Sequence, residues 1–265
     1  MVNRMEGTKI KKCCELSAGI SPDAIVIVGI ANAGLVGAIA ATHIIEKMKL
    51  EEVAHIHSSL FPPMSVFIDG ILKNPFRIYA DLKAPDGKLK RATTFVVTSE
   101  LPLNKETYHE IAHVLVDYIQ GLGIKLIVTL VGFPVEEMES IEIFYAAEPE
   151  LMERLKKVKR IQPLPKGMIF GIEALVLNEA LERDIDGFTL IAPVKEYLPA
   201  TRSAAALIEA LNEIFPFLKI EVKELLQRDD QLQAKLKELA EQVRRSQVEE
   251  YTPPPPSKSM NSLFT

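Results

Sequence analysis

The segment from Ala24 to Met48 constrains the fold more than any other part of the chain, because a buried strand, a glycine-bearing turn and a helix follow one another directly. Residues 24–28 form a short apolar run bounded by turn residues, which is typical of a parallel strand covered on both faces. Three glycines follow between residues 29 and 37. This pattern predicts a strand–turn–helix unit of an α/β fold.

The glycine turn is similar to two phosphate-binding patterns and satisfies neither. A P-loop needs a lysine and a serine or threonine directly after its second glycine, whereas Leu35 and Val36 occupy those places. A dinucleotide-binding turn needs an acidic ribose ligand at the end of the next strand, which here ends in His57. We therefore favour a packing role, in which small side chains let the helix approach the sheet closely. The residues with this role are Gly34, Gly37, Ala38, Ala40 and Ala41.

Composition narrows the classes of partner and location. The chain has 265 residues, of which 48% are hydrophobic and 25% charged, enough for one large domain with appendages. Its formal charge of −5 and the lack of a basic cluster argue against nucleic acid. No apolar stretch is long enough to span a membrane, and the first residues do not resemble a secretion signal. We therefore expect a cytoplasmic protein, with the adjacent Cys13 and Cys14 as two reduced thiols.

The order of the remaining elements predicts the rest of the fold. A tight turn is expected at Asp69-Gly70 and another at Asp86-Gly87, within a β-rich stretch. Strands are predicted at 53–57, 76–79, 93–98, 124–131 and 188–192, and helices at 106–120, 173–182 and 202–214. This order predicts a mainly parallel sheet flanked by helices, with an antiparallel excursion, in a core domain at 1–217.

Beyond the core, residues 218–245 predict an amphipathic helix with a narrow apolar stripe. The stripe consists of Val222, Leu225, Leu232, Leu236, Leu239 and Val243. Such a helix either folds back on its own domain or pairs with another subunit. Asp229 falls on the stripe and would weaken a long continuous coil, so we expect subunit contacts along part of the helix only.

A Pro-rich flexible tail is predicted at 246–265. Pro253 to Pro256 form a stiff extended spacer, and the chain then finishes with Leu263, Phe264 and Thr265. Tails of this kind often bind nothing. An apolar anchor beside a terminal carboxylate is, however, also a known means of binding a partner's pocket.

His109 to His113 form a complete H-E-x-x-H motif, in which two histidines one helical turn apart bind zinc. The apolar face of this helix points elsewhere, so both histidines are expected to face water. The third ligand of the extended motif is also missing, because Ile119 stands in its place. We therefore expect no metal here, and we interpret His55 and His57 as ordinary sheet residues. Ser99-Glu100 follows a strand but lacks a paired base in the sequence.

The chain contains an ordered series of short segments: residues 27–37, Leu50-Glu-Glu-Val53, Phe61-Pro-Pro63, Asp69-Gly70, Arg77-Ile-Tyr79, Thr98-Ser-Glu-Leu-Pro102, Tyr108 to Gly123 and Gly167 to Pro193. In this order, the series resembles the proteasome assembly chaperone family in its archaeal form. The resemblance implies a nucleoside-phosphorylase-like core without enzymatic use and without a cofactor. It also implies self-association and ATP-independent binding to proteasome α-subunits. One departure is visible, because the family loop usually reads Gly-Phe-Pro-Gly whereas this chain has Gly29-Ile-Ala-Asn32.

The resemblance also gives the tail a role. Proteasome activators and assembly factors commonly end in a hydrophobic residue, tyrosine and any residue, and Leu263-Phe264-Thr265 is similar. The leading hypothesis is a homo-oligomeric chaperone or adaptor that binds the α-ring through this tail, with a second, related chaperone chain left open as a partner. The alternative is an α/β enzyme, either nucleoside-phosphorylase-like or a zinc-dependent hydrolase that uses His109 and His113.

Overall fold

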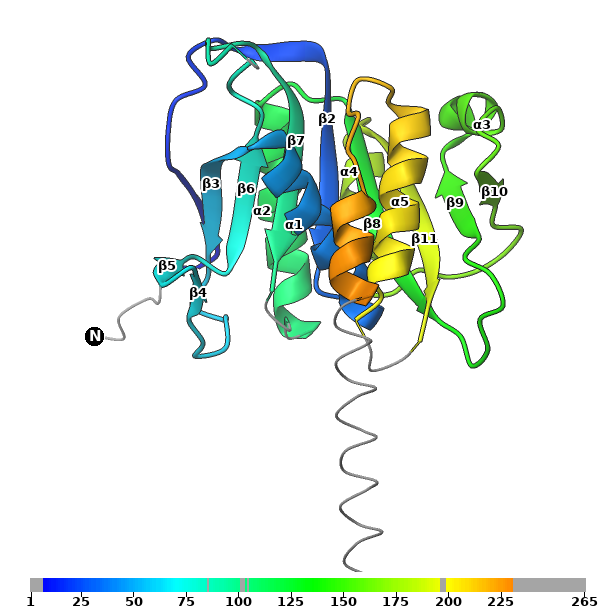
Figure 1. Cartoon of the computed structure of the whole chain (residues 1–265). Helices are drawn as coiled ribbons and strands as arrows, with labels where there is room; N and C mark the ends of the chain where they lie inside the picture. The colour runs from blue at the N-terminus through cyan, green and yellow to red at the C-terminus, as the bar shows by residue number, and fades with distance from the viewer. Residues whose placement is uncertain (1–6, 85, 101–102, 104, 196–198, 231–265) are drawn as a thin grey trace, which may run out of the picture. The chain divides into compact units, whose positions relative to one another are not determined.

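The computed structural model describes residues 7–84, 86–100, 103, 105–195 and 199–230 (Figure 1). The chain divides into two compact units, Met1–Leu225 and Leu226–Thr265. Residues 223–230 are helical, so the helix predicted over 218–245 begins later than predicted, and Val222 of the apolar stripe precedes it. The later residues of the apolar stripe and the whole tail at 246–265 lie outside the described residues. Within the described part, no helix combines the length and the apolar character needed to cross a bilayer.

The first unit is built on a mixed sheet, in which nine strands of the described chain take the order β1-β3-β6-β7-β2-β8-β11-β9-β10. These strands are β1 (Lys9–Lys12), β2 (Ile20–Ile30), β3 (Glu51–His57), β6 (Phe76–Ala80), β7 (Ala92–Ser99), β8 (Leu126–Pro134), β9 (Ile143–Ala147), β10 (Ile161–Pro163) and β11 (Asp186–Val194). The central strands β7, β2, β8 and β11 run parallel, while β1, β3 and β6 are joined antiparallel at one flank. The predicted α/β class with an antiparallel excursion is confirmed.

Helices cover both faces of the sheet (Figure 1). The helices are α1 (Val36–Met48), α2 (Tyr108–Gly121), α3 (Pro149–Leu155), α4 (Ile172–Leu181) and α5 (Thr201–Ile214). On one face α1 packs against α5, and on the other α2 packs against α4. Residues 24–30 of β2 are therefore buried without interruption, as expected for a central strand between two helical layers.

The glycine turn is closed by the chain's own backbone. A Cβ atom added at Gly29 would lie 2.3 Å from the Gly37 carbonyl oxygen. One added at Gly132 in β8 would lie 2.2 Å from the Ala33 carbonyl oxygen. Both distances are far below van der Waals contact, so only glycine permits this approach of turn, helix and sheet. Among the residues predicted to have a packing role, Gly37 is equally restricted, because an added Cβ would lie 2.8 Å from the Leu130 carbonyl oxygen.

A small hairpin of two strands, β4 (Val66–Ile68) and β5 (Ile71–Lys73), stands apart from the main sheet. Its turn has φ of 50° at Asp69 and 78° at Gly70. Positive φ at both central residues is the requirement of a tight type I′ hairpin turn, which Asp-Gly favours. The predicted turn at this dipeptide is confirmed, and the side chains nearest the turn, those of Phe67, Ile68, Ile71 and Leu72, are exposed.

Candidate functional site

The carboxyl ends of the central parallel strands are where α/β proteins usually bind ligands, and Asn32 occupies this position after β2. Its Nδ2 donates to the Leu130 carbonyl oxygen at 2.8 Å and to Glu173 Oε1 at 2.9 Å. Its Oδ1 accepts a hydrogen bond from the Gly37 amide at 3.4 Å. The Asn32 side chain thus takes the place beside the helix amides where a phosphate would otherwise bind.

Glu173, in the first turn of α4, makes this position still less suitable for an anion. Its side chain is 3% exposed, and burial raises the pKa of its carboxyl, with the Asn32 hydrogen bond acting in the opposite direction. The pKa of Tyr108 is also raised, first by burial and then by the charge of Glu173. The Glu173 carboxyl would repel a phosphate, and backbone atoms occupy the space beside the glycines. The turn therefore has a structural role, which is to hold the helix against the sheet.

Glu100, which directly follows β7, takes part in a structural ion pair. Ser99 is fully buried, and Glu100 forms a salt bridge with Arg77. Arg77 Nε also donates to Tyr79 Oη at 2.9 Å, and its NH1 to the Asn74 carbonyl oxygen at 2.6 Å. Burial opposes the charge of Arg77, but the hydrogen bonds and charges around it outweigh this and raise its pKa. Glu100 therefore serves to neutralise a buried guanidinium.

The H-E-x-x-H histidines face water, as predicted. His109 is exposed, and His113 Nδ1 accepts a hydrogen bond from Arg183 at 2.9 Å, because a guanidinium can only donate. Glu179 Oε2 lies 3.3 Å from the same nitrogen and also pairs with Arg183. Within the described residues, neither histidine belongs to a group of three side chains placed to hold a metal. The motif forms part of a surface ion network.

An apolar pocket of about 620 Å³ lies where β8 and β11 end, beside the segment 164–170. The rim carries large exposed side chains: Phe133 is 59% exposed, Met168 77% and Phe170 75%. Among the described residues that line the pocket, Asn32 and Lys166 supply the polar side chains, and the Asn32 amide is already hydrogen-bonded. This arrangement suits an apolar side chain of a partner better than a polar substrate.

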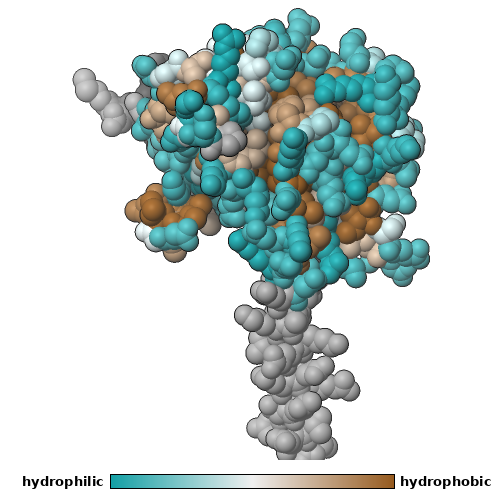
Figure 2. Space-filling model, turned by 45° about the horizontal axis from the view of Figure 1, so that its top comes forward, coloured by the Kyte–Doolittle hydropathy of each residue, from teal (hydrophilic) through white to brown (hydrophobic). Residues whose placement is uncertain are grey.

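The β4–β5 hairpin forms a second apolar surface. Phe67 is 70% exposed, Ile71 61% and Leu72 75%. Figure 2 shows these hydrophobic atoms as a separate brown patch at the lower left, where the hairpin projects. Clustered exposed side chains of this size are typical of protein-binding surfaces.

The residues proposed from sequence for partner contacts are only partly described. Leu263, Phe264 and Thr265 lie outside the described residues, as do Leu232, Leu236, Leu239 and Val243. Val222 is half-buried, and Leu225 is 8% exposed within the single chain. Sequence analysis missed both apolar surfaces; the signal was present as Phe67, Ile71 and Leu72 beside an Asp-Gly turn, where polar residues are more usual.

Comparison with known proteins shows which fold family this is. A chain from Pyrococcus furiosus described as PbaA, an archaeal homolog of proteasome-assembly chaperone, superposes with a TM-score of 0.79, 22% identity and coverage of 91% of this chain and 96% of that one. The archaeal proteasome activator PbaB from P. furiosus superposes with a TM-score of 0.76 and 24% identity, and the match covers 89% of this chain and 100% of that one. A Thermoplasma acidophilum protein of unknown function superposes with a TM-score of 0.71 and 30% identity, and the match covers 89% of this chain and 93% of that one.

The sequence itself gives the same assignment. The family model described as the PAC2 family matches residues 26–240, which include the second half of β2, the glycine turn, the central strands β7, β8 and β11, and the helices on both faces. The resemblance drawn from the ordered sequence segments is thereby confirmed, and the chain belongs to the PAC2 family.

Proposed function

We propose that this protein is an ATP-independent proteasome assembly chaperone or adaptor, which self-associates and binds proteasome α-subunits or the α-ring. The observation that carries the proposal is the PAC2 match over residues 26–240. The P. furiosus chains that share its fold, described as a homolog of proteasome-assembly chaperone and as a proteasome activator, support it. A cytoplasmic, archaeal setting belongs to the same proposal.

The geometry of the strand ends supports binding over catalysis. Asn32 and Glu173 satisfy one another, and Glu100 neutralises Arg77, so these polar groups have partners within the chain. The pocket beside β8 and β11 is lined mainly by apolar side chains, and the β4–β5 hairpin adds a second apolar surface. Holding another protein requires such surfaces and needs no acid–base pair.

The proposed contact with the α-ring is the tail. Leu263 and Phe264 would fill an apolar groove between α-subunits, while the carboxylate of Thr265 would pair with a lysine. Phenylalanine lacks the phenolic hydroxyl of the usual tyrosine, and the missing hydrogen bond is worth about 1 kcal/mol. Self-association compensates, because one bound tail raises the effective concentration of the next.

Self-association is proposed through the C-terminal helix. Leu225 is already covered within its own chain at 8% exposure. The proposed subunit contacts therefore concentrate on the residues farther along the stripe, Leu232, Leu236, Leu239 and Val243. A narrow stripe of this kind is buried by pairing with a second helix.

Co-purification with α-rings tests the proposal. The full chain is expected to retain α-rings, and a chain without residues 263–265 is expected to lose them. Phe264→Tyr is expected to bind about fivefold more tightly, as one regained hydrogen bond of about 1 kcal/mol implies. A chain with glycines at 257–259 keeps the tail length and serves as the matched control. Unchanged binding after the deletion would exclude the tail mechanism alone. Native mass spectrometry shows whether the full chain binds α-subunits as an oligomer. If it does not bind them, the proposed function is excluded.

A further inference from the structure

At the edge of the sheet, three side chains with metal-binding atoms converge, and neither the fold nor the proposed function uses them. The Cys13 Sγ lies 3.4 Å from His55 Nδ1 and 3.8 Å from Glu52 Oε1. His55 Nδ1 and Glu52 Oε1 are 3.7 Å apart. We propose that Cys13, Glu52 and His55 bind a zinc ion that links the residue after β1 to β3.

The local backbone explains why these side chains meet. Residues three apart in a regular strand point to opposite faces, so Glu52 and His55 should diverge. The pairing of β3 with β6 shifts register between Glu52 and Ala54, which leaves one extra residue, Val53, as a bulge. The bulge turns Glu52 onto the face of His55. Directly after β1, the Cys13 amide donates to the Val53 carbonyl oxygen at 2.8 Å and fixes the thiol beside both side chains.

The spacing fits a tetrahedral metal with little rearrangement. Zinc bonds of about 2.0–2.3 Å to sulfur, nitrogen and oxygen place the ligand atoms about 3.3–3.6 Å apart. The observed separations of 3.4, 3.7 and 3.8 Å exceed this range by at most a few tenths of an ångström. A thiolate, an imidazole and a carboxylate together form a donor set that zinc accepts readily, and three protein ligands leave a fourth position open.

Other contacts already orient the ligands. The second carboxylate oxygen of Glu52, Oε2, lies 3.4 Å from Lys73 Nζ, so the oxygen Oε1 is left to face the thiol and the imidazole. Partners of this kind fix the direction of a metal ligand. Glu52 and His55 are 17% and 16% exposed at their side chains, so the site is partly shielded and still accessible to an ion.

A catalytic thiol explains the cluster less well. In a nucleophile–histidine–acid triad, the nucleophile and the acid contact different nitrogens of the imidazole. Here Cys13 and Glu52 both face Nδ1 of His55. Burial, followed by the negative charge of Glu52, raises the pKa of the Cys13 thiol, whereas an activated nucleophile has a lowered one.

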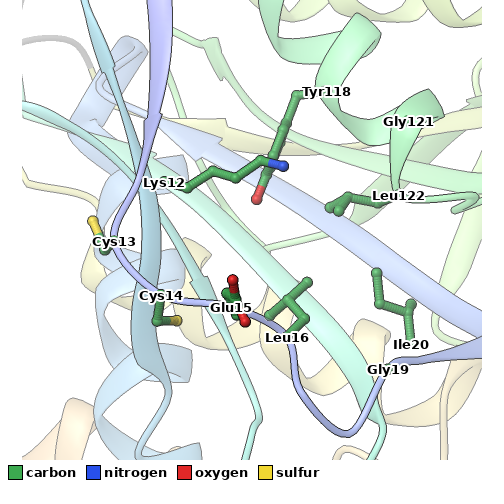
Figure 3. A pocket seen from close by; sticks show the side chains of 10 residues that line it. All are labelled: Lys12, Cys13, Cys14, Glu15, Leu16, Gly19, Ile20, Tyr118, Gly121 and Leu122. Atoms are coloured by element: carbon green, nitrogen blue, oxygen red, sulfur yellow. The ribbon is translucent and has the colours of Figure 1, made fainter.

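The chain supplies matched controls for the site. Figure 3 shows the side chains of Cys13 and Cys14 pointing to different sides of the chain, although both residues line the same surface pocket beside Tyr118, and only Cys13 belongs to the group of three. Cys14→Ser therefore removes a neighbouring thiol without removing a ligand. His57→Gln does the same for the imidazole, because His57 follows His55 on the same strand and lies outside the group of three.

Zinc binding to the tag-free, reduced full-length chain tests the proposal. Titration calorimetry is expected to give one zinc per chain, and cobalt to give a thiolate charge-transfer band. Cys13→Ser and His55→Gln are expected to weaken zinc binding by more than about 100-fold, because loss of a residue that merely orients a ligand costs about 10–100-fold. Cys14→Ser and His57→Gln should match the wild type, and thermal melts without zinc should show all four variants folded.

The same measurements can overturn the site. The proposal fails if the wild-type chain shows no saturable zinc binding, or if Cys13→Ser binds zinc as tightly as the wild type. It also fails if Cys14→Ser or His57→Gln weakens zinc binding as much as Cys13→Ser does. Loss of the zinc in His113→Gln would assign the metal to the H-E-x-x-H motif instead. None of these outcomes depends on proteasome binding.

Discussion

The turn after β2 and the edge of the sheet at β1 and β3 both gather polar side chains, but they differ in where those side chains find their partners. At the turn, Asn32 links the Leu130 carbonyl, the Gly37 amide and Glu173, so its polar atoms are used within the chain. At the edge, the polar atoms of Cys13, Glu52 and His55 converge on a common point.

This difference shows that a motif and a site are separate properties. The turn has a spacing close to that of a phosphate loop, yet the volume beside its glycines is filled by backbone atoms. The edge has no motif, yet its three ligand atoms stand at distances that a single ion can bridge. Hydrogen bonds to backbone groups and to a buried carboxyl mark a structural element, whereas three metal-binding side chains within reach of one ion mark a candidate site.

The largest effect is expected from crowding the turn. In Gly29→Ala, the new Cβ would lie 2.3 Å from the Gly37 carbonyl oxygen and 2.7 Å from Ala41 Cβ. Because backbone must move, we expect a loss of about 3 kcal/mol or more in the free energy of unfolding. Gly121→Ala is the control, since its Cβ meets nothing within 4 Å and should change stability by about 1 kcal/mol or less. Urea denaturation measures both, and a mild Gly29→Ala would mean that the turn is open after all.

Zinc should stabilise the edge by a comparable amount. At a free zinc concentration about 100 times the Kd, binding to the folded state adds about 2.7 kcal/mol. For a chain of this size we expect the Tm to rise by about 5–11 °C. The rise should vanish in Cys13→Ser and persist in Cys14→Ser. A rise of the same size in both variants would show that zinc acts elsewhere.

Removing the Asn32 amide should show how much its hydrogen bonds contribute to stability. Asn32→Ala leaves the buried Glu173 carboxylate without its side-chain donor, and we expect a loss of about 1–3 kcal/mol in unfolding free energy. The double variant with Glu173→Gln should lose less than the sum of the two single variants, by about 0.5 kcal/mol or more. Additive losses would argue that the two side chains act independently.

The smallest effect should be a change in how stability depends on pH when Glu173 is replaced by glutamine. Burial raises the pKa of Glu173 above its unfolded value. Its contribution to stability is therefore fully present below a pH of about 4.3 and is lost as the pH rises through the folded pKa, at about 1.4 kcal/mol per unit of difference. Glu173→Gln cannot ionise, so its stability relative to the wild type should be higher at pH 7 than at pH 4. Parallel denaturation curves at the two pH values would contradict this assignment.

Most of the central fold could be predicted from the sequence, because its strands and helices have strong periodicity. The strand at 24–28 extends to Ile20–Ile30, and the helix at 202–214 is Thr201–Ile214. The stretch between β8 and α4 is not predicted, because β9, α3 and β10 are too short to show a clear period. Short elements of this kind are positioned by pairing with the rest of the sheet, which local patterns do not contain.

The candidate sites were predicted less completely, for a different reason. Cys13 and His55 are far apart in the sequence and meet only through the antiparallel pairing of β1 with β3. Glu52 joins them only because Val53 is a bulge, and strict alternation would have turned it away. The tail residues Leu263, Phe264 and Thr265 stay predictions, since they lie outside the described residues.

The bulge at Val53 has a consequence for how such a cluster can arise. Because strand side chains alternate between faces, one added residue moves everything beyond it to the other side of the strand. A single-codon insertion or deletion at this point could create or abolish the alignment of Glu52 with His55 while leaving every residue type unchanged. Relatives could therefore keep the cysteine, the glutamate and the histidine and still differ in whether the three meet, so the length of β3 is the inherited character to compare.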